Sequence, residues 1–252
     1  MQLIDKVAII TGSARGMGKV FALRFVREGA KVTVCDILDC GAAAKEIKAA
    51  GGDVLALKTD VTSEQDTEQM AKQTVERFGR IDILVNNAAV YGGIENKNFA
   101  KPFEQITTQE WDKMMAVNLK GIFLCCKAVL PYMKKQGQGK IINIGSTVAF
   151  AGAPLFLHYT TSKGGVWSMT KALARALGQF NINVNAIAPG MTLTEATTSM
   201  FSESTSGQIM ATQCIKRPTQ PEHIAGAAVF LASADADQIT GQTLAVNAGE
   251  YV

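Results

Sequence analysis

The sequence contains few residues of the kinds that bind metal ions or form disulfide frameworks. Its 252 residues include two histidines, His158 and His223, and five cysteines, none of which forms a Cys-x-x-Cys pair. Two histidines this far apart do not form a recognisable zinc site, and an odd number of cysteines argues against a disulfide framework. We therefore expect reduced cysteines and no metal site, so that any chemistry has to work without a metal ion.

Long apolar runs and concentrated charge are also missing. No uninterrupted apolar run reaches the ~18 residues that a membrane span needs, and strand-like sequence begins within a few residues of the start. The formal net charge is +3 and the basic residues are dispersed, while the pair Lys134-Lys135 is typical of a solvated helix end. These absences predict a cytoplasmic protein with no nucleic-acid partner and no membrane contact.

Strand-like and helix-like segments alternate along the whole chain. The expected strands are 7–10, 31–35, 54–58, 81–86, 140–145, 183–188 and 243–246. Helical patterns fill the gaps, the longest over 109–135, and the segments 107–110 and 219–222 each fit a capping box. Such alternation predicts a parallel, doubly wound α/β sheet of seven strands flanked by helices, in a single domain over 1–252.

A glycine-rich turn follows the first expected strand. The apolar run 7–10 leads into the segment 11–18, with Gly12, Gly16 and Gly18, and a helical pattern follows. In a dinucleotide-binding turn, the first glycine permits a sharp exit from the strand, the second lets backbone approach a pyrophosphate, and the third lets helix and strand pack closely. The helix N-terminus then faces the anion.

An acidic residue, Asp36, ends the second expected strand. A carboxylate at this place suits hydrogen bonding to the ribose hydroxyls of NAD and repels the 2′-phosphate of NADP. Two readings oppose this: Arg15 in the glycine loop could attract a 2′-phosphate, and Asp36 could be a plain turn residue at a strand end. The glycine turn before it favours the ribose role, and the predicted cofactor is NAD.

Tyr159 and Lys163 lie four positions apart and therefore share one face of a helix. A free phenol loses its proton near pH ~10, so it transfers protons poorly at neutral pH unless positive charge nearby stabilises the phenolate. Lys163 could supply that charge. Taken alone, the pair could equally be a half-exposed aromatic side chain with a solvated neighbour.

With these features the sequence resembles the short-chain dehydrogenase/reductase family, specifically its group with a Thr-Gly-x-x-x-Gly-x-Gly loop and a Tyr-x-x-x-Lys pair. The further matching pieces are Asp60-Val61, Asn86-Asn87-Ala88-Ala89, Asn118, Ser146, Pro189-Gly190 and Ile239-Thr240-Gly241-Gln242. One departure is Ala89, which stands where the family pattern has glycine. The resemblance implies the strand order 3-2-1-4-5-6-7 and a homotetramer.

The resemblance also implies the roles of individual residues. Tyr159 would be the acid/base, Lys163 would lower its pKa and hold the nicotinamide ribose, and Ser146 would bind the substrate oxygen. Asn118 would anchor a water behind Lys163. The implied catalytic residues are Asn118, Ser146, Tyr159 and Lys163. The implied cofactor-binding residues are Gly12, Arg15, Gly16, Met17, Gly18, Asp36, Asp60, Val61, Asn87, Ala88, Tyr159, Lys163, Pro189, Gly190, Thr192 and Thr194.

The expected reaction is reversible hydride transfer between NAD and a secondary alcohol or ketone. Segment 192–215 has little helical pattern and is expected to be a mobile lid over the substrate. The expected walls of the pocket are Val148, Phe150, Leu155, His158, Met191, Met200 and the loop 91–94. These mostly apolar residues favour an aromatic or cyclic substrate. Two alternatives are a 3-oxoacyl thioester reductase, which would normally use NADPH, and a non-catalytic NAD-binding sensor.

Overall fold

The strands form one parallel sheet in the order β3-β2-β1-β4-β5-β6-β7. The computed structural model describes residues 1–91, 99–200 and 202–251. Within them the strands are β1 Val7–Thr11, β2 Lys31–Asp36, β3 Val54–Lys58, β4 Ile83–Asn86, β5 Gly139–Ile144, β6 Ile182–Pro189 and β7 Thr243–Val246. This sheet confirms the predicted fold class, the strand order and the position of every expected strand to within two residues.

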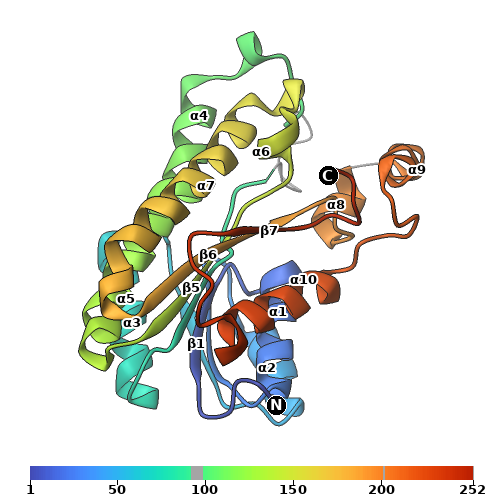
Figure 1. Cartoon of the computed structure of the whole chain (residues 1–252). Helices are drawn as coiled ribbons and strands as arrows, with labels where there is room; N and C mark the ends of the chain where they lie inside the picture. Colours follow the sequence, from blue (N-terminus) through green and yellow to red (C-terminus); the bar gives the residue numbers. More distant parts are fainter. Residues whose placement is uncertain (92–98, 201, 252) are drawn as a thin grey trace.

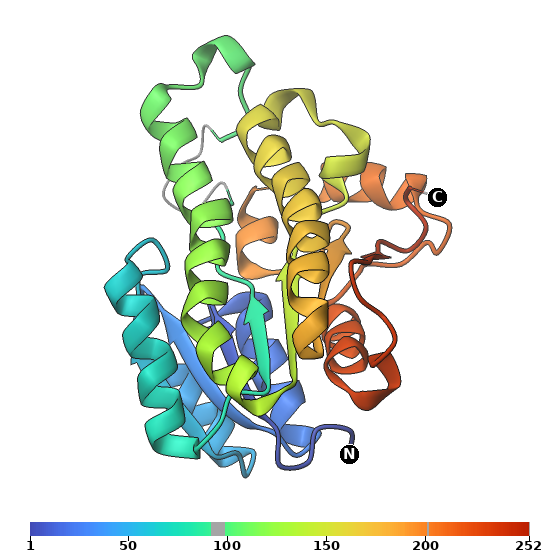
Figure 2. The same cartoon turned by 60° about the vertical axis from the view of Figure 1, so that its left-hand side comes forward.

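Helices cover both faces of the sheet (Figure 1). One face carries α1 Gly16–Arg27, α2 Gly41–Ala49 and α10 Pro221–Ala232, and the other carries α3 Glu64–Phe78, α5 Gly121–Gln136 and α7 Leu157–Leu177. Figure 2 shows α5 and α7 side by side in front of the sheet. Because buried strands meet apolar helix faces on both sides, a hydrophobic core fills each of the two interfaces.

The two cores meet at the central strands. The first core includes Phe21 and Phe25 of α1, packed with Ile10 of β1. The second includes Ile9 of β1 and Met133 of α5. Neighbouring residues of one strand therefore point into opposite cores, which fixes the register of the sheet and with it the residues that reach its carboxyl edge.

Side-chain caps define several helix starts. The predicted capping box at Thr107 is confirmed, since its hydroxyl accepts the N–H of Glu110 and the Glu110 carboxylate accepts the N–H of Thr107. The box predicted over 219–222 is wrong by one residue. There the cap is Gln220, whose N–H donates to Nδ1 of His223 at 3.0 Å, so this histidine serves as a cap on an exposed helix start.

The longest helical segment is interrupted. The pattern over 109–135 predicts one helix, and the structure has α4 Thr108–Met115, a π-helical turn Ala116–Lys120 and then α5. The stretch of 29 residues is long enough to cross a membrane, and it contains a window of 18 residues that is apolar enough to do so. Half of its most apolar window is buried inside the fold, which is the behaviour of a core helix.

The segment predicted as a lid contains two short helices, α8 Glu195–Met200 and α9 Glu203–Thr212, where little helical pattern was expected. Local caps explain the difference. The Thr197 N–H donates to the Thr194 hydroxyl at 3.2 Å, and the Thr205 N–H donates to the Ser202 hydroxyl at 3.2 Å. Serine and threonine weaken helix interiors but stabilise helix starts. The lid role itself stays a prediction.

Candidate active site

Lys163 is buried beneath the carboxyl edge of the sheet. It lies on α7 at 4% exposure, and its Nζ donates to the carbonyl oxygen of Ile144, the last residue of β5, at 2.8 Å. Burial lowers the pKa of this ammonium to about 8. A lysine in that range can hold or release a proton near neutral pH, so it fits a proton-transfer site better than a solvated surface position.

Tyr159 lies one helical turn before Lys163 and is also buried. Burial raises the pKa of its phenol above the usual range, the neighbouring Tyr91 adds to this, and a hydrogen bond with Ser146 opposes it. The expected lowering of the Tyr159 pKa by Lys163 is not found. The Lys163 Nζ is committed to Ile144 and lies 5.6 Å from the centre of the Tyr159 ring, so desolvation dominates.

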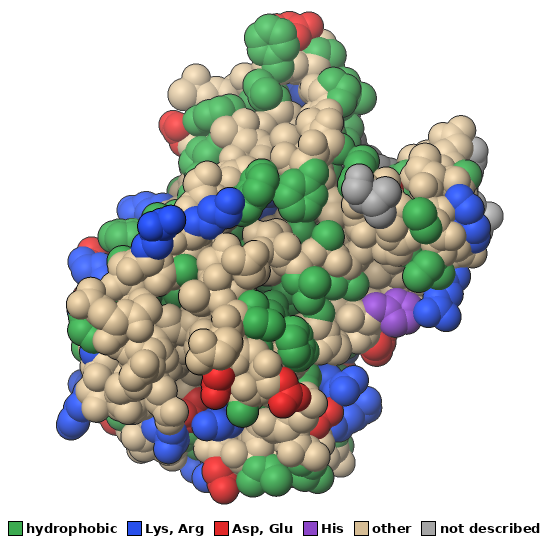
Figure 3. Space-filling view, in the orientation of Figure 1, with side chains coloured by type: hydrophobic (Ala, Val, Ile, Leu, Met, Phe, Trp, Pro, Cys, Tyr) green, Lys and Arg blue, Asp and Glu red, His purple; other side chains and the backbone are tan. Residues whose placement is uncertain are grey.

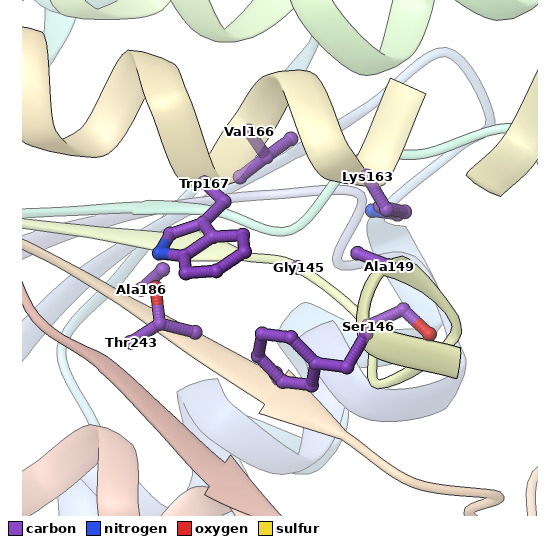
Figure 4. Close-up of a pocket in the computed structure, with 10 residues that line it drawn as sticks. Gly145, Ser146, Ala149, Lys163, Val166, Trp167, Ala186 and Thr243 are labelled. Atoms are coloured by element: carbon purple, nitrogen blue, oxygen red, sulfur yellow. The ribbon is translucent and has the colours of Figure 1, made fainter. Parts of the chain in front are cut away.

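Ser146 follows β5 and brings a second hydroxyl to Tyr159. Its side chain borders a small pocket between α6 Val148–Ala151, α7, the end of β5, the middle of β6 and the start of β7. In Figure 4, Ser146 and Lys163 lie toward one end of this pocket, and Trp167 and Thr243 lie toward the other. The structure thus brings Ser146, Tyr159 and Lys163 together, as the sequence predicts.

Asn118 sits in the π-helical turn with its side chain buried. Its Oδ1 accepts the N–H of Val90 at 2.8 Å, and its Nδ2 donates to the Val90 carbonyl at 3.1 Å and to the Ser162 hydroxyl at 3.0 Å. The amide therefore fixes the backbone just after β4 against α7. The water-anchoring role implied for Asn118 stays a prediction.

The glycine loop fits a bound dinucleotide by close backbone packing. Gly12 has φ +65°, and a Cβ there would lie 2.7 Å from Cα of Ala88; one at Gly18 would lie 2.6 Å from Nδ2 of Asn87. At Gly16, φ is +58° and nothing lies within 4 Å of a Cβ position, so the backbone is open there. This cradle, at the start of a helix with no acidic residue in its first turn, suits a pyrophosphate.

Asn87 and Ala88 hold that loop from the neighbouring strand. The Nδ2 of Asn87 donates to the carbonyls of Thr11 at 2.9 Å and Gly12 at 2.8 Å. The N–H groups of Asn87 and Ala88 both donate to the Thr11 hydroxyl, at 3.1 and 3.0 Å. Thr11, at the end of a buried strand, is a structural contributor that the sequence reasoning missed. Ala89, the departure from the family pattern, is exposed.

Asp36 ends β2 beside the glycine loop. Its Oδ2 accepts the N–H of Ala14 at 3.1 Å, and its Oδ1 accepts the N–H of Leu38 at 3.1 Å. The carboxylate is thereby held at the edge of the loop where an adenosine ribose would lie. Arg15 is exposed and Met17 packs against the first core, so Arg15 is the loop side chain that remains in solvent.

The other implied cofactor residues border the same edge. Asp60 caps a turn by accepting the N–H and hydroxyl of Thr62 at 2.8 and 2.7 Å. Val61 is buried against Gly121, where a Cβ would lie 2.8 Å from Val61 Cγ2. Both residues therefore lie where β3 leads into α3, next to the predicted adenosine position.

Pro189 ends β6, and Gly190 packs against the C-terminal segment. A Cβ at Gly190 would lie 2.9 Å from the Asn247 Cβ. The hydroxyl of Thr192 donates to the Gly190 carbonyl at 3.1 Å, whereas Thr194 is used in the local cap with Thr197. The backbone here is held in place, and its contact with a cofactor stays a prediction.

The predicted pocket walls separate into three groups. Val148 packs with Tyr159 in a small aromatic cluster. Phe150 and Leu155 are exposed, and Phe150 packs edge to face on Trp167 at 5.3 Å. The loop residues 92–94 and the side chain of Met200 lie outside what the structure describes.

His158 is buried and its ring centre lies 5.1 Å from that of Phe99. Burial lowers the pKa of this imidazole, which favours its neutral form. It packs in the aromatic surroundings of Tyr159, and its expected role as a pocket wall stays a prediction.

The fold and the site define an oxidoreductase built on a dinucleotide-binding sheet. The family model described as enoyl-(acyl carrier protein) reductase matches residues 12–250. The chain belongs to the short-chain dehydrogenase/reductase family, whose members bind a nicotinamide cofactor.

Relatives cover nearly the whole chain. It is 38% identical over 252 residues to the 3-oxoacyl-(acyl-carrier-protein) reductase FabG of Staphylococcus epidermidis, covering 99% of this chain and 100% of that protein. It is 39% identical over 251 residues to the (2S)-((R)-hydroxy(phenyl)methyl)succinyl-CoA dehydrogenase subunit BbsD of Thauera aromatica, covering 99% and 98%. Among solved structures, levodione reductase superposes with a TM-score of 0.90 at 30% identity, covering 99% of this chain and 98% of that one.

Proposed function

We propose that this protein is an NAD(H)-linked oxidoreductase that interconverts 3-oxoacyl and 3-hydroxyacyl thioesters. The reaction class rests on one observation. Ser146, just after β5, lies close to Tyr159 and Lys163 in the first turns of α7. The substrate class rests on the two relatives above, because both of their names specify thioesters, one on a carrier protein and one on CoA. These relatives favour the thioester over the simple alcohol expected from the pocket walls.

The residues of the site suit carbonyl reduction. A bound reduced nicotinamide would supply the hydride to the C3 carbon of the substrate. The Ser146 hydroxyl donates a hydrogen bond to the C3 oxygen, and the Tyr159 hydroxyl delivers the proton that this oxygen needs as it becomes a hydroxyl. Lys163 then returns a proton toward Tyr159, which its depressed pKa of about 8 permits near neutral pH. In the oxidation direction each transfer is reversed.

The choice of NAD(H) rests on Asp36. Its carboxylate is held beside the glycine loop by Ala14 and Leu38, where a 2′-phosphate would meet a negative charge. The exposed Arg15 is the one basic side chain within that loop. A carboxylate fixed by two backbone N–H groups outweighs a solvated guanidinium, because screening weakens exposed charges.

A second candidate substrate class is an aromatic or cyclic secondary alcohol. The observation in its favour is the aromatic cluster around Tyr159, in which Tyr91 and Phe99 lie 5.0 and 6.0 Å from the Tyr159 ring centre. Figure 3 also shows hydrophobic side chains along the hollow between the α6–α7 part and the arm that carries α8 and α9. We propose that segment 192–215, in this arm, closes over the bound substrate.

Steady-state assays of the purified chain test the proposal. We would follow oxidation of NADH and of NADPH with acetoacetyl-CoA, acetophenone and cyclohexanone. The proposal expects NADH with acetoacetyl-CoA to give a kcat/KM at least about tenfold above the other pairs. Higher turnover of the two ketones would favour the second candidate, and tight NADH binding without any turnover would favour a non-catalytic sensor.

We also propose a homotetramer, as the family resemblance implies. Exposed apolar side chains on α5 and α7, including Phe123 at 51% and Trp167 at 38% exposure, support an association surface. Sedimentation equilibrium of the purified protein would test this, and a monomer at micromolar concentration would contradict it.

A further inference from the structure

Tyr91 brings a second phenol to the active site. It follows β4 at the carboxyl edge of the sheet, and its ring centre lies 5.0 Å from that of Tyr159, with the two planes tilted by 58°. Its side chain is half-buried. Tyr91 and Tyr159 therefore pack against each other from two elements, the segment after β4 and the start of α7.

The position of Tyr91 is held from both sides. The preceding residue, Val90, is bound through its N–H and its carbonyl by the buried amide of Asn118. The ring itself packs edge to face on Phe99, with centres 5.8 Å apart. A side chain held by an anchored backbone and by aromatic packing loses little entropy when a ligand binds, which is what a specificity residue requires.

The chemistry of Tyr91 is that of a hydrogen-bond donor. Burial raises the pKa of its phenol to about 12, so the hydroxyl keeps its proton throughout the neutral range. A neutral phenol in a partly desolvated site binds an acceptor atom of the substrate and disfavours substrates that offer none.

We infer that Tyr91 is a specificity residue whose hydroxyl donates a hydrogen bond to the thioester carbonyl of a 3-oxoacyl substrate, while Ser146 and Tyr159 bind the reacting carbonyl. A 3-oxoacyl thioester carries two carbonyl oxygens on carbons separated by one methylene group. Donors on two adjacent rings match two acceptors at such close spacing. This inference rests on the proposed thioester function, and it assigns the second acceptor to a named residue.

The variant Tyr91→Phe tests the assignment, because phenylalanine keeps the ring packing and removes only the hydroxyl. The two substrates are acetoacetyl-CoA and 2-pentanone, a ketone without the second carbonyl. We expect kcat/KM for acetoacetyl-CoA to fall about five- to tenfold, mainly through KM, and kcat/KM for 2-pentanone to change less than about twofold. Tyr132→Phe, which removes a phenol hydroxyl on α5 away from the site, is the matched control and should change neither.

The outcomes separate this inference from the proposed function. Wild-type preference for 2-pentanone over acetoacetyl-CoA would overturn both. Wild-type preference for the thioester with no change in Tyr91→Phe would overturn the inference alone. An equal fall of kcat on both substrates would also overturn it, since the hydroxyl would then act through Tyr159. Thermal unfolding of each variant, expected within about 2 °C of wild type, keeps a folding defect from being mistaken for a lost contact.

Discussion

The coenzyme side and the substrate side of the active site are built in different ways. On the coenzyme side, glycine backbone lies directly against its neighbours: Gly12 and Gly18 pack against Asn87 and Ala88, and hydrogen bonds from these two residues hold Thr11 at the start of the loop. On the substrate side, side chains pack on side chains, as in the cluster of Tyr91, Phe99 and Tyr159. Close packing at Gly12 and Gly18 leaves no room for an added Cβ, whereas the side-chain packing can be changed one group at a time.

The sharpest way to test this contrast is to remove the group that both sides share. Tyr159→Phe removes the proton donor while its ring stays in place, so turnover should fall about 100- to 10,000-fold with NADH affinity nearly unchanged. Stopped-flow turnover and fluorescence titration with NADH measure the two quantities. Activity within a fewfold of wild type would exclude Tyr159 as the acid/base.

A methyl group added on the coenzyme side should damage the fold as well as binding. In Gly18→Ala the Cβ would meet the Gly12 carbonyl and Asn87 Nδ2, so we expect a loss of about 1–3 kcal/mol in unfolding free energy and weaker NADH binding. Urea unfolding and calorimetric titration provide the readouts. The control Gly226→Ala adds a methyl to a helix where nothing lies within 4 Å, and it should leave both unchanged or slightly raise stability.

The burial of Lys163 should make the stability of the fold depend on pH. Its pKa is lowered to about 8 from 10.5, so between those values the unfolded chain binds a proton that the folded chain does not. The unfolding free energy of wild type, relative to Lys163→Met, should therefore rise by about 2 kcal/mol from about pH 7 to about pH 9.5. Urea unfolding of both proteins across this range measures the difference, and parallel pH curves would contradict a depressed pKa.

The smallest expected effect concerns the coenzyme phosphate. Asp36→Asn removes the charge but keeps an oxygen to accept the Ala14 N–H, so the preference for NADH over NADPH should fall about tenfold. The ratio of kcat/KM for the two coenzymes provides the measure. Asp39→Asn, on an exposed loop carboxylate, should leave that ratio unaltered, and a similar change in both variants would point to general electrostatics.

The same contrast explains what the sequence could predict. The strands, the glycine loop and the grouping of Ser146 with Tyr159 and Lys163 follow from local pattern and family resemblance, because the chain order of these pieces determines where they lie in a parallel sheet. The π-helical turn at Asn118 does not, since it depends on how that amide reaches Val90 across the fold.

Two other features depended on contacts that pattern cannot supply. The helices α8 and α9 start at threonine and serine caps in a segment with little apolar periodicity. Tyr91 appeared in the sequence only as part of an apolar loop, because its partner Tyr159 is distant in the chain. The signal that could have identified Tyr91 is its position, four residues after Asn87 and close to the carboxyl end of an expected strand.

Asn118 binds the two polar groups of Val90 as a neighbouring strand would. A helix side chain thereby pairs with the backbone after β4 in place of a strand, and it holds the chain at Val90. The backbone that presents Tyr91 is accordingly held by a helix side chain and not by strand pairing.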